Sequence, residues 1–156
     1  MEKFLHHADK EISGILTHYP LPLFVLGPER VVGHFKAHSH HLKNIVASIY
    51  GNYVDAGEAE LRDVVQPGLE IWRLRGRQQL LSLLQNAAGQ KRLSVGSKEA
   101  AAAAHDNGGL LVVEDGFRFP ELDALIGQVL QHGGDVEFID DGALTAYDRI
   151  ALIRYY

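Results

Sequence analysis

The sequence predicts an α/β fold, and three observations support this prediction. Short apolar runs that suit strands alternate along the chain with longer amphipathic segments that suit helices. A helix between two strands favours parallel pairing, because a parallel pair needs a crossover connection. The composition, 46% hydrophobic and 22% charged, is ordinary for a globular chain that buries a core.

The predicted strands are short runs of branched and aromatic residues, namely residues 23–26, 44–50, 109–113, 136–139 and 150–155. The predicted helices are residues 2–17, about ten residues from position 28, 56–93, 97–105 and 120–131. Pro67 and Gly68 lie inside the longest helix and should kink or split it. The elements form two sets, before and after a glycine-containing loop at 51–57. The first set has only two strands, which is a poor basis for an independent core.

The N-terminus and the amino-acid usage predict a cytoplasmic protein. MEKFLHHADKEISG carries charges where a signal peptide needs an apolar centre, and no apolar run approaches the ~18 residues of a membrane span. The chain has no cysteine, which excludes disulfides, thiol nucleophiles and cysteine-ligated metal sites.

Charge is unevenly distributed along the chain, whose net charge is −5. Residues 57–93 carry six bases and four acids, whereas residues 94–156 carry four bases and eleven acids. The acidic part should repel phosphate backbones and is better suited to a protein partner or simply to solubility. The basic segment contains the candidate RNA contacts Arg73, Arg75, Arg77, Lys91 and Arg92, which would otherwise belong to a solvated helix.

Two further groups of residues are candidates for a site. Glu114 and Asp115 follow the strand GLLVV, and the carboxyl ends of parallel strands are where ligands gather in α/β folds. They could line a ligand pocket or simply mark where the strand meets water. His38, His40 and His41 are weak metal candidates, because their spacing does not place them on one helical face. We expect a solvated helix end there and no metal.

The segment FVLGPERVVGHF, residues 24–35, reads as a strand, a tight turn and a helix. It lacks the Gly-Lys-Ser/Thr of a phosphate loop, and only one glycine lies in its turn. We therefore interpret it as structural and expect no cofactor.

A series of phrases in the chain resembles a known family: PLFVLGPERVVGHF, NIVASIYGNYVDAGEAEL, VGSKEAAAAAHDNGGLLVVEDG, HGGDVEFID and DRIALIRYY. In this order they resemble the second half of the class-1 peptide release factors of archaea and eukaryotes and of their relative Pelota. The best likeness is to the bacterial homologues of that family. The resemblance implies a partial α/β middle domain at residues 1–54. It implies a C-terminal three-layer α/β/α sandwich at 55–156, similar to the ribosomal-protein fold that binds kink-turn RNA.

The departures from the family pattern limit the activity that the resemblance implies. Release activity in the family rests on a Gly-Gly-Gln loop, and this sequence contains no Gly-Gly-Gln. Kink-turn binders of the related fold carry Gly-x-Asn-Glu at one helix start, where this chain has Lys98 in place of the asparagine. We therefore expect a protein without catalytic residues that binds the ribosome or a translation partner.

Two alternatives and one further expectation remain open. The chain could be an α/β enzyme or small-ligand binder with a pocket near Glu114 and Asp115, or a structural protein-interaction domain. Because an unpaired strand edge is a template for another chain, we also expect a homodimer formed through residues 1–54.

Overall fold

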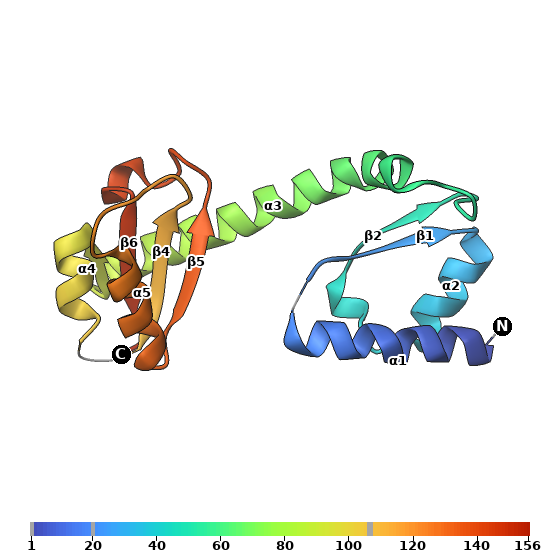
Figure 1. Ribbon diagram of the computed structural model, residues 1–156, viewed down its shortest axis with the longest axis horizontal. Helices are drawn as coiled ribbons and strands as arrows, with labels where there is room; N and C mark the ends of the chain where they lie inside the picture. The colour runs from blue at the N-terminus through green and yellow to red at the C-terminus, as the bar shows by residue number, and fades with distance from the viewer. Residues whose placement is uncertain (1, 20, 106–107) are drawn as a thin grey trace. The chain divides into compact units, whose positions relative to one another are not determined.

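The computed structural model describes residues 2–19, 21–105 and 108–156, and its helices and two sheets confirm the α/β class (Figure 1). The chain forms two compact units, Met1–Arg75 and Gly76–Tyr156. The first unit contains α1 (Glu2–His18), β1 (Leu23–Gly27), α2 (Glu29–His38), the 3-10 turn η1 (Leu42–Asn44), β2 (Ile45–Tyr50) and the start of α3 (Glu58–Gly89). The second contains the rest of α3, β3 (Leu93–Val95), α4 (Ser97–Ala103), β4 (Gly109–Glu114), α5 (Leu122–Gln131), β5 (Asp135–Ile139), η2 (Thr145–Tyr147) and β6 (Ile150–Arg154).

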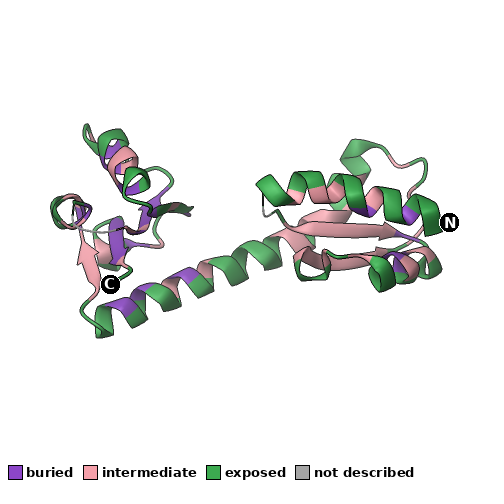
Figure 2. Ribbon diagram, turned by 90° about the horizontal axis from the view of Figure 1, so that it is seen from below, coloured by how far each residue is buried: buried purple, intermediate pink, exposed green. Residues whose placement is uncertain are grey.

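The first unit is built on two parallel strands with a small core. β1 pairs with β2, and Phe24 lies opposite Ala47 in the register. Among its described residues, the buried apolar side chains are Leu5, Val32 and Phe35. β1 and β2 are mostly only half-buried, as their intermediate colour in Figure 2 shows. Two strands therefore leave much of this sheet accessible.

The long helix α3 is continuous, so Pro67 and Gly68, which were expected to kink or split it, do not split it. A proline inside a helix removes one backbone hydrogen bond, and the residues on both sides supply the remaining bonds. Gly68 also has a packing role, since a Cβ placed there would lie 2.8 Å from Cε1 of Phe24. The missing side chain lets α3 approach the sheet of the first unit closely.

The second unit contains a four-stranded sheet in the order β3-β6-β4-β5. β4 and β5 are parallel, but β6 is antiparallel to both β3 and β4, which corrects the expectation of parallel pairing throughout. The reason is that residues 140–149 join β5 to β6 without a crossover helix, so the chain returns in the opposite direction. β3 was not predicted, because its three residues are too few to show a period.

Helices cover both faces of this second sheet. On one face α4 and α5 pack on β4 and β6 through a cluster of Ala100, Ala104, Leu111, Val113, Leu122, Leu125, Val129, Ile150 and Leu152. On the other face α3 and the loop before β6 pack through Leu80, Leu84, Ala87, Val112, Ile139, Leu144, Ala151 and Ile153. Successive residues of β4 alternate between the two clusters, as the period of a strand requires. Within the described ranges, no helix is long and apolar enough to cross a membrane.

Candidate RNA-binding residues and strand-end pocket

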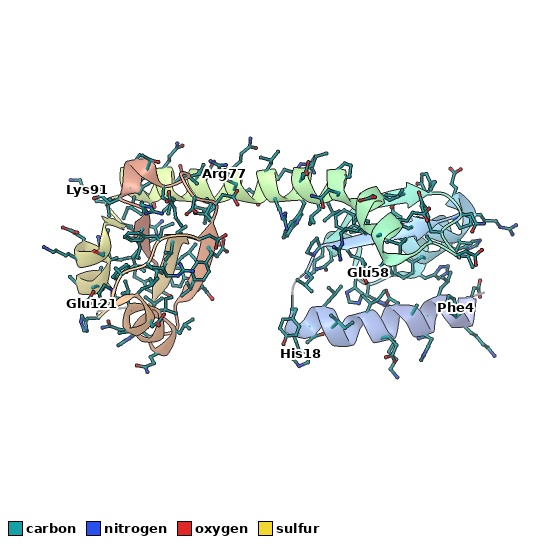
Figure 3. All side chains as sticks on the ribbon, turned by 45° about the horizontal axis from the view of Figure 1, so that its top comes forward. Phe4, His18, Glu58, Arg77, Lys91 and Glu121 are labelled. Atoms are coloured by element: carbon teal, nitrogen blue, oxygen red, sulfur yellow. The ribbon has the colours of Figure 1, made fainter. Side chains whose placement is uncertain are left out.

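Three of the predicted RNA contacts lie on α3. Arg73 and Arg77 are four residues apart and share one helical face, whereas Arg75 lies on another. Arg73 and Arg75 are exposed. Arg77, labelled in Figure 3, has its guanidinium 3.9 Å from a carboxylate oxygen of Asp140. Arg73 and Arg75 are therefore more available to a phosphate than Arg77 is.

The other two predicted contacts, Lys91 and Arg92, follow the end of α3. Arg92 donates hydrogen bonds to the carbonyl oxygens of Arg154 at 3.1 Å and Tyr155 at 3.4 Å, and also to the side chain of Gln90. Arg154 in turn donates to the carbonyl of Lys91 at 2.6 Å. These bonds join the turn after α3 to the end of β6. The Arg92 guanidinium thus has structural partners, while the side chain of Lys91 is exposed.

One pocket of the first unit brings Arg75 together with residues that the sequence did not single out. A depression of about 300 Å³ is lined by Leu21, Pro22, Lys43, Asn44, Ile45, Val46, Trp72 and Arg75. Trp72 and Arg75 lie three residues apart on α3, and Lys43 comes from η1. Sequence reasoning missed Lys43 because nearly thirty residues separate it from Trp72. The sequence signal that could have indicated this pocket is Trp72, which is adjacent to the predicted phosphate contacts Arg73 and Arg75.

The structure separates the two acids of the predicted strand-end pocket. Glu114 is buried, with 1% of its surface exposed, and Asp115 is exposed. Oε1 of Glu114 accepts a hydrogen bond from the backbone N–H of Leu144 at 2.7 Å. Oε2 accepts one from Nε of Arg149 at 2.8 Å. The hydrogen bond from Arg149 lowers the pKa of Glu114 and outweighs the opposing effect of burial.

A depression of about 440 Å³ adjoins this carboxylate and is lined by Glu114, Gly142, Thr145, Asp148 and Arg149. Asp148 and Arg149 both have positive φ, 51° and 66°, a backbone conformation that non-glycine residues seldom adopt. The Arg149 guanidinium lies 4.9 Å from the ring centroid of Phe117 and 3.5 Å from Asp141. Glu114 and Arg149 thus hold each other, and Asp115 does not line the depression.

Two of the candidate histidines, His40 and His41, lie near a carboxylate of α1 that the sequence did not single out. Asp9 of α1 is 4% exposed and accepts hydrogen bonds from Oγ of Ser39 at 2.6 Å and Nδ1 of His40 at 2.9 Å. Nε2 of His41 lies 2.6 Å from Oγ of Ser13. Burial acts to raise the pKa of Asp9, but these hydrogen bonds and the nearby His41 outweigh it, so that the pKa is lowered. The arrangement ties the loop after α2 to α1.

The predicted metal candidates do not converge in the described part of the chain. His38 contacts the carbonyl of His34 one turn before it through Nδ1, at 2.8 Å. Among the described residues, no group of three or more histidine and acidic side chains is arranged to hold a metal ion.

Comparison with known proteins identifies the family. The family model of bacterial archaeo-eukaryotic release factor family 3 matches residues 1–107. Similar solved structures include an archaeal translation termination factor, aRF1, at 15% identity and a TM-score of 0.44, covering 99% of this chain and 50% of that chain. They also include the Pelota protein of Thermoplasma acidophilum at 14% identity and a TM-score of 0.49, covering 95% and 51%.

A third similar structure, described as an archaeal protein, has 14% identity and a TM-score of 0.45, covering 98% of this chain and 49% of that chain. The present chain thus spans about half the length of each of these structures. Among curated proteins no match was found. Since the family model matches more than half of the sequence, the resemblance is confirmed, and the chain belongs to bacterial archaeo-eukaryotic release factor family 3.

Proposed function

We propose that this chain is a non-catalytic, translation-associated module that binds the ribosome or a translation partner. The observation that carries the proposal is membership of a release factor family over residues 1–107. Such a role would place the protein in the cytoplasm. It would also assign the predicted domains, residues 1–54 and 55–156, to the middle and C-terminal domains of a release factor.

The sequence supports the non-catalytic part of this proposal. Release activity in the family rests on Gly-Gly-Gln, whereas the two Gly-Gly pairs of this chain are followed by Leu110 and Asp135. These 156 residues therefore lack the loop that would reach a peptidyl-tRNA ester.

The exposed cations of α3 support the binding part. Arg73 and Arg75 are exposed and make no ion pair with any described acidic side chain within 4.0 Å. Lysine and arginine side chains that contact phosphates release counterions, so affinity falls as salt rises. Arg77 would contribute less, because Asp140 already lies beside it.

Co-sedimentation with ribosomes across a salt series tests the proposal. We expect the protein to pellet with ribosomes at low salt and to be released as salt rises. Arg73→Glu with Arg75→Glu should weaken pelleting and flatten its salt dependence. Lys10→Glu with Lys36→Glu is the matched control, because it makes the same change in net charge at two exposed residues outside α3. Absence from the ribosome pellet at low salt would overturn the proposal.

The proposal of a homodimer through residues 1–54 rests on the small core of the first unit. Only three of its described apolar side chains are buried, while Phe4, Ile15 and Tyr50 are each more than half exposed. A two-stranded sheet also has a free edge on each strand. Sedimentation equilibrium should show a mass that rises with concentration toward that of two chains. A monomer mass at every concentration would contradict this proposal.

A further inference from the structure

The depression around Trp72 combines an aromatic surface with two cations. Trp72 and Arg75 come from α3, and Lys43 and Asn44 come from η1, just before β2. Its volume of about 300 Å³ lies at the small end of ligand pockets, which run from roughly 300 to 1,000 Å³. The pocket lies wholly within the first compact unit.

The charged side chains of the pocket are all positive. Neither Lys43 nor Arg75 lies within 4.0 Å of a described carboxylate, and no acidic residue lines the depression. Lys43 contributes a mobile ammonium and Arg75 a planar guanidinium, and both groups bind phosphate oxygens. The pocket therefore favours an anion.

Trp72 remains 40% exposed although it lines a pocket. A tryptophan indole stacks on nucleobases of any sequence, and removing such a stack costs about 1–3 kcal/mol per base. Asn44 lines the same depression, and its side-chain amide donates a hydrogen bond to the carbonyl oxygen of Leu21 at 3.5 Å. An aromatic ring beside cations is the arrangement by which proteins bind unpaired nucleotides.

We propose that this pocket binds one unpaired nucleotide of single-stranded RNA, with the base stacked on Trp72 and the adjacent phosphate held by Lys43 and Arg75. The choice of RNA over another phosphorylated ligand rests on the proposed translation role. The pocket itself rests on its geometry. It adds Lys43 and Trp72 to the contacts that the arginines of α3 would make.

The chain offers a direct probe, because Trp72 is its only tryptophan. Titration with a short oligouridylate at low salt should quench the tryptophan emission to saturation. Lys43→Glu with Arg75→Glu should abolish the quenching. The Lys10→Glu and Lys36→Glu protein, which has the same net charge, should retain it.

A second measurement follows a fluorescent oligouridylate by anisotropy, so that Trp72 itself can be changed. Trp72→Ala should weaken binding about tenfold, and Trp72→Phe, which keeps an aromatic ring, should recover part of that loss. Circular dichroism checks that each variant is folded. Full binding by Trp72→Ala, or an absence of quenching in the wild-type protein, would overturn the proposal.

Binding of uridine monophosphate distinguishes a pocket for free nucleotides from a pocket for nucleotides within RNA. Binding as tight as that of the oligouridylate would assign the pocket to free nucleotides and overturn the RNA proposal. The translation role is tested separately by the ribosome pellet. Ribosome binding without oligouridylate binding would refute the pocket alone, whereas oligouridylate binding without ribosome binding would refute the translation role alone.

Discussion

Arg149 and Glu114 are joined by a hydrogen bond of 2.8 Å between Nε and a buried carboxylate oxygen. The same carboxylate accepts a hydrogen bond from the backbone N–H of Leu144. One side chain at the end of β4 therefore binds two residues of the connection from β5 to β6. Both Asp148 and Arg149 keep a strained positive φ in this connection. The pair thus secures the antiparallel return of β6.

Replacing Glu114 should therefore destabilise the second unit. Glu114→Ala leaves the backbone N–H of Leu144 and the side chain of Arg149 without their partner, so we expect a clear fall in the melting temperature followed by circular dichroism. Asp115→Ala is the matched control, because Asp115 is exposed, and it should melt close to wild type. Equal effects of the two changes would contradict this assignment.

The Glu114 pair should also make stability depend on pH. The pKa of Glu114 is lowered from its ordinary value of 4.5, so its contribution is present above that value and is lost as the pH falls through the folded pKa. Glu114→Gln should be less stable than wild type near neutral pH. The difference should shrink in acid, which urea unfolding at several pH values would measure. A difference that stays constant would argue against the ion pair.

Asp9 should stabilise the first unit through its bonds to Ser39 and His40. Asp9→Ala leaves these donors without their acceptor, and we expect a loss of about 2 kcal/mol in unfolding free energy. Because the pKa of Asp9 is lowered from 3.8, this stability is present above that value and declines at lower pH. Urea unfolding followed by Trp72 fluorescence reports this unit. Glu11→Ala, at an exposed position of α1, should have little effect.

Two glycines of α3 should respond oppositely to alanine. Gly76→Ala meets nothing within 4 Å and should stabilise the helix by up to about 1 kcal/mol. Gly68→Ala places a Cβ 2.8 Å from the Phe24 ring and should destabilise the protein by about 1–3 kcal/mol. Urea unfolding of both variants measures the difference. Stabilisation by Gly68→Ala would show that α3 does not approach the sheet so closely.

Tyr155 should ionise at a higher pH than a free tyrosine. Its hydroxyl donates a hydrogen bond to Asp135, and this bond, followed by burial, raises the pKa of Tyr155 to about 12. A raised pKa stabilises the fold below the ordinary value of 10.0, and this contribution is lost as the pH rises through the folded value. Ultraviolet titration should show a tyrosine that ionises late. Asp135→Asn should bring that tyrosine back toward its ordinary pKa, and an unchanged titration would refute the interaction.

Local pattern was sufficient to predict most elements of this protein. The apolar runs at β1, β2 and β4 and the helical spacing in α1 and α5 lie where the sequence predicts them. The three-residue strand β3 was hidden, because its residues bond only to distant β6. The antiparallel direction of β6 was also not predicted from local pattern, because it depends on a connection that contains no crossover helix.

The candidate sites show the same limit of local pattern. Glu114 and Asp115 are adjacent in sequence, but Glu114 is the last residue of β4 and is buried against Leu144 and Arg149, whereas Asp115 lies in the turn after the strand and is exposed. Asp9 lies about thirty residues from Ser39 and His40, which it contacts, and no spacing rule connects them.

By itself, the sequence determined the α/β class, the order of most elements, the absence of Gly-Gly-Gln and the family to which the chain belongs. Only the tertiary structure decided that Glu114 pairs with Arg149, that Asp9 binds His40 in the loop after α2, and that Lys43 lines the same pocket as Trp72. The physical reason is the separation along the sequence of the residues that interact. Secondary structure follows from neighbours within a few residues, whereas a site is made by contacts between residues that are far apart in the chain.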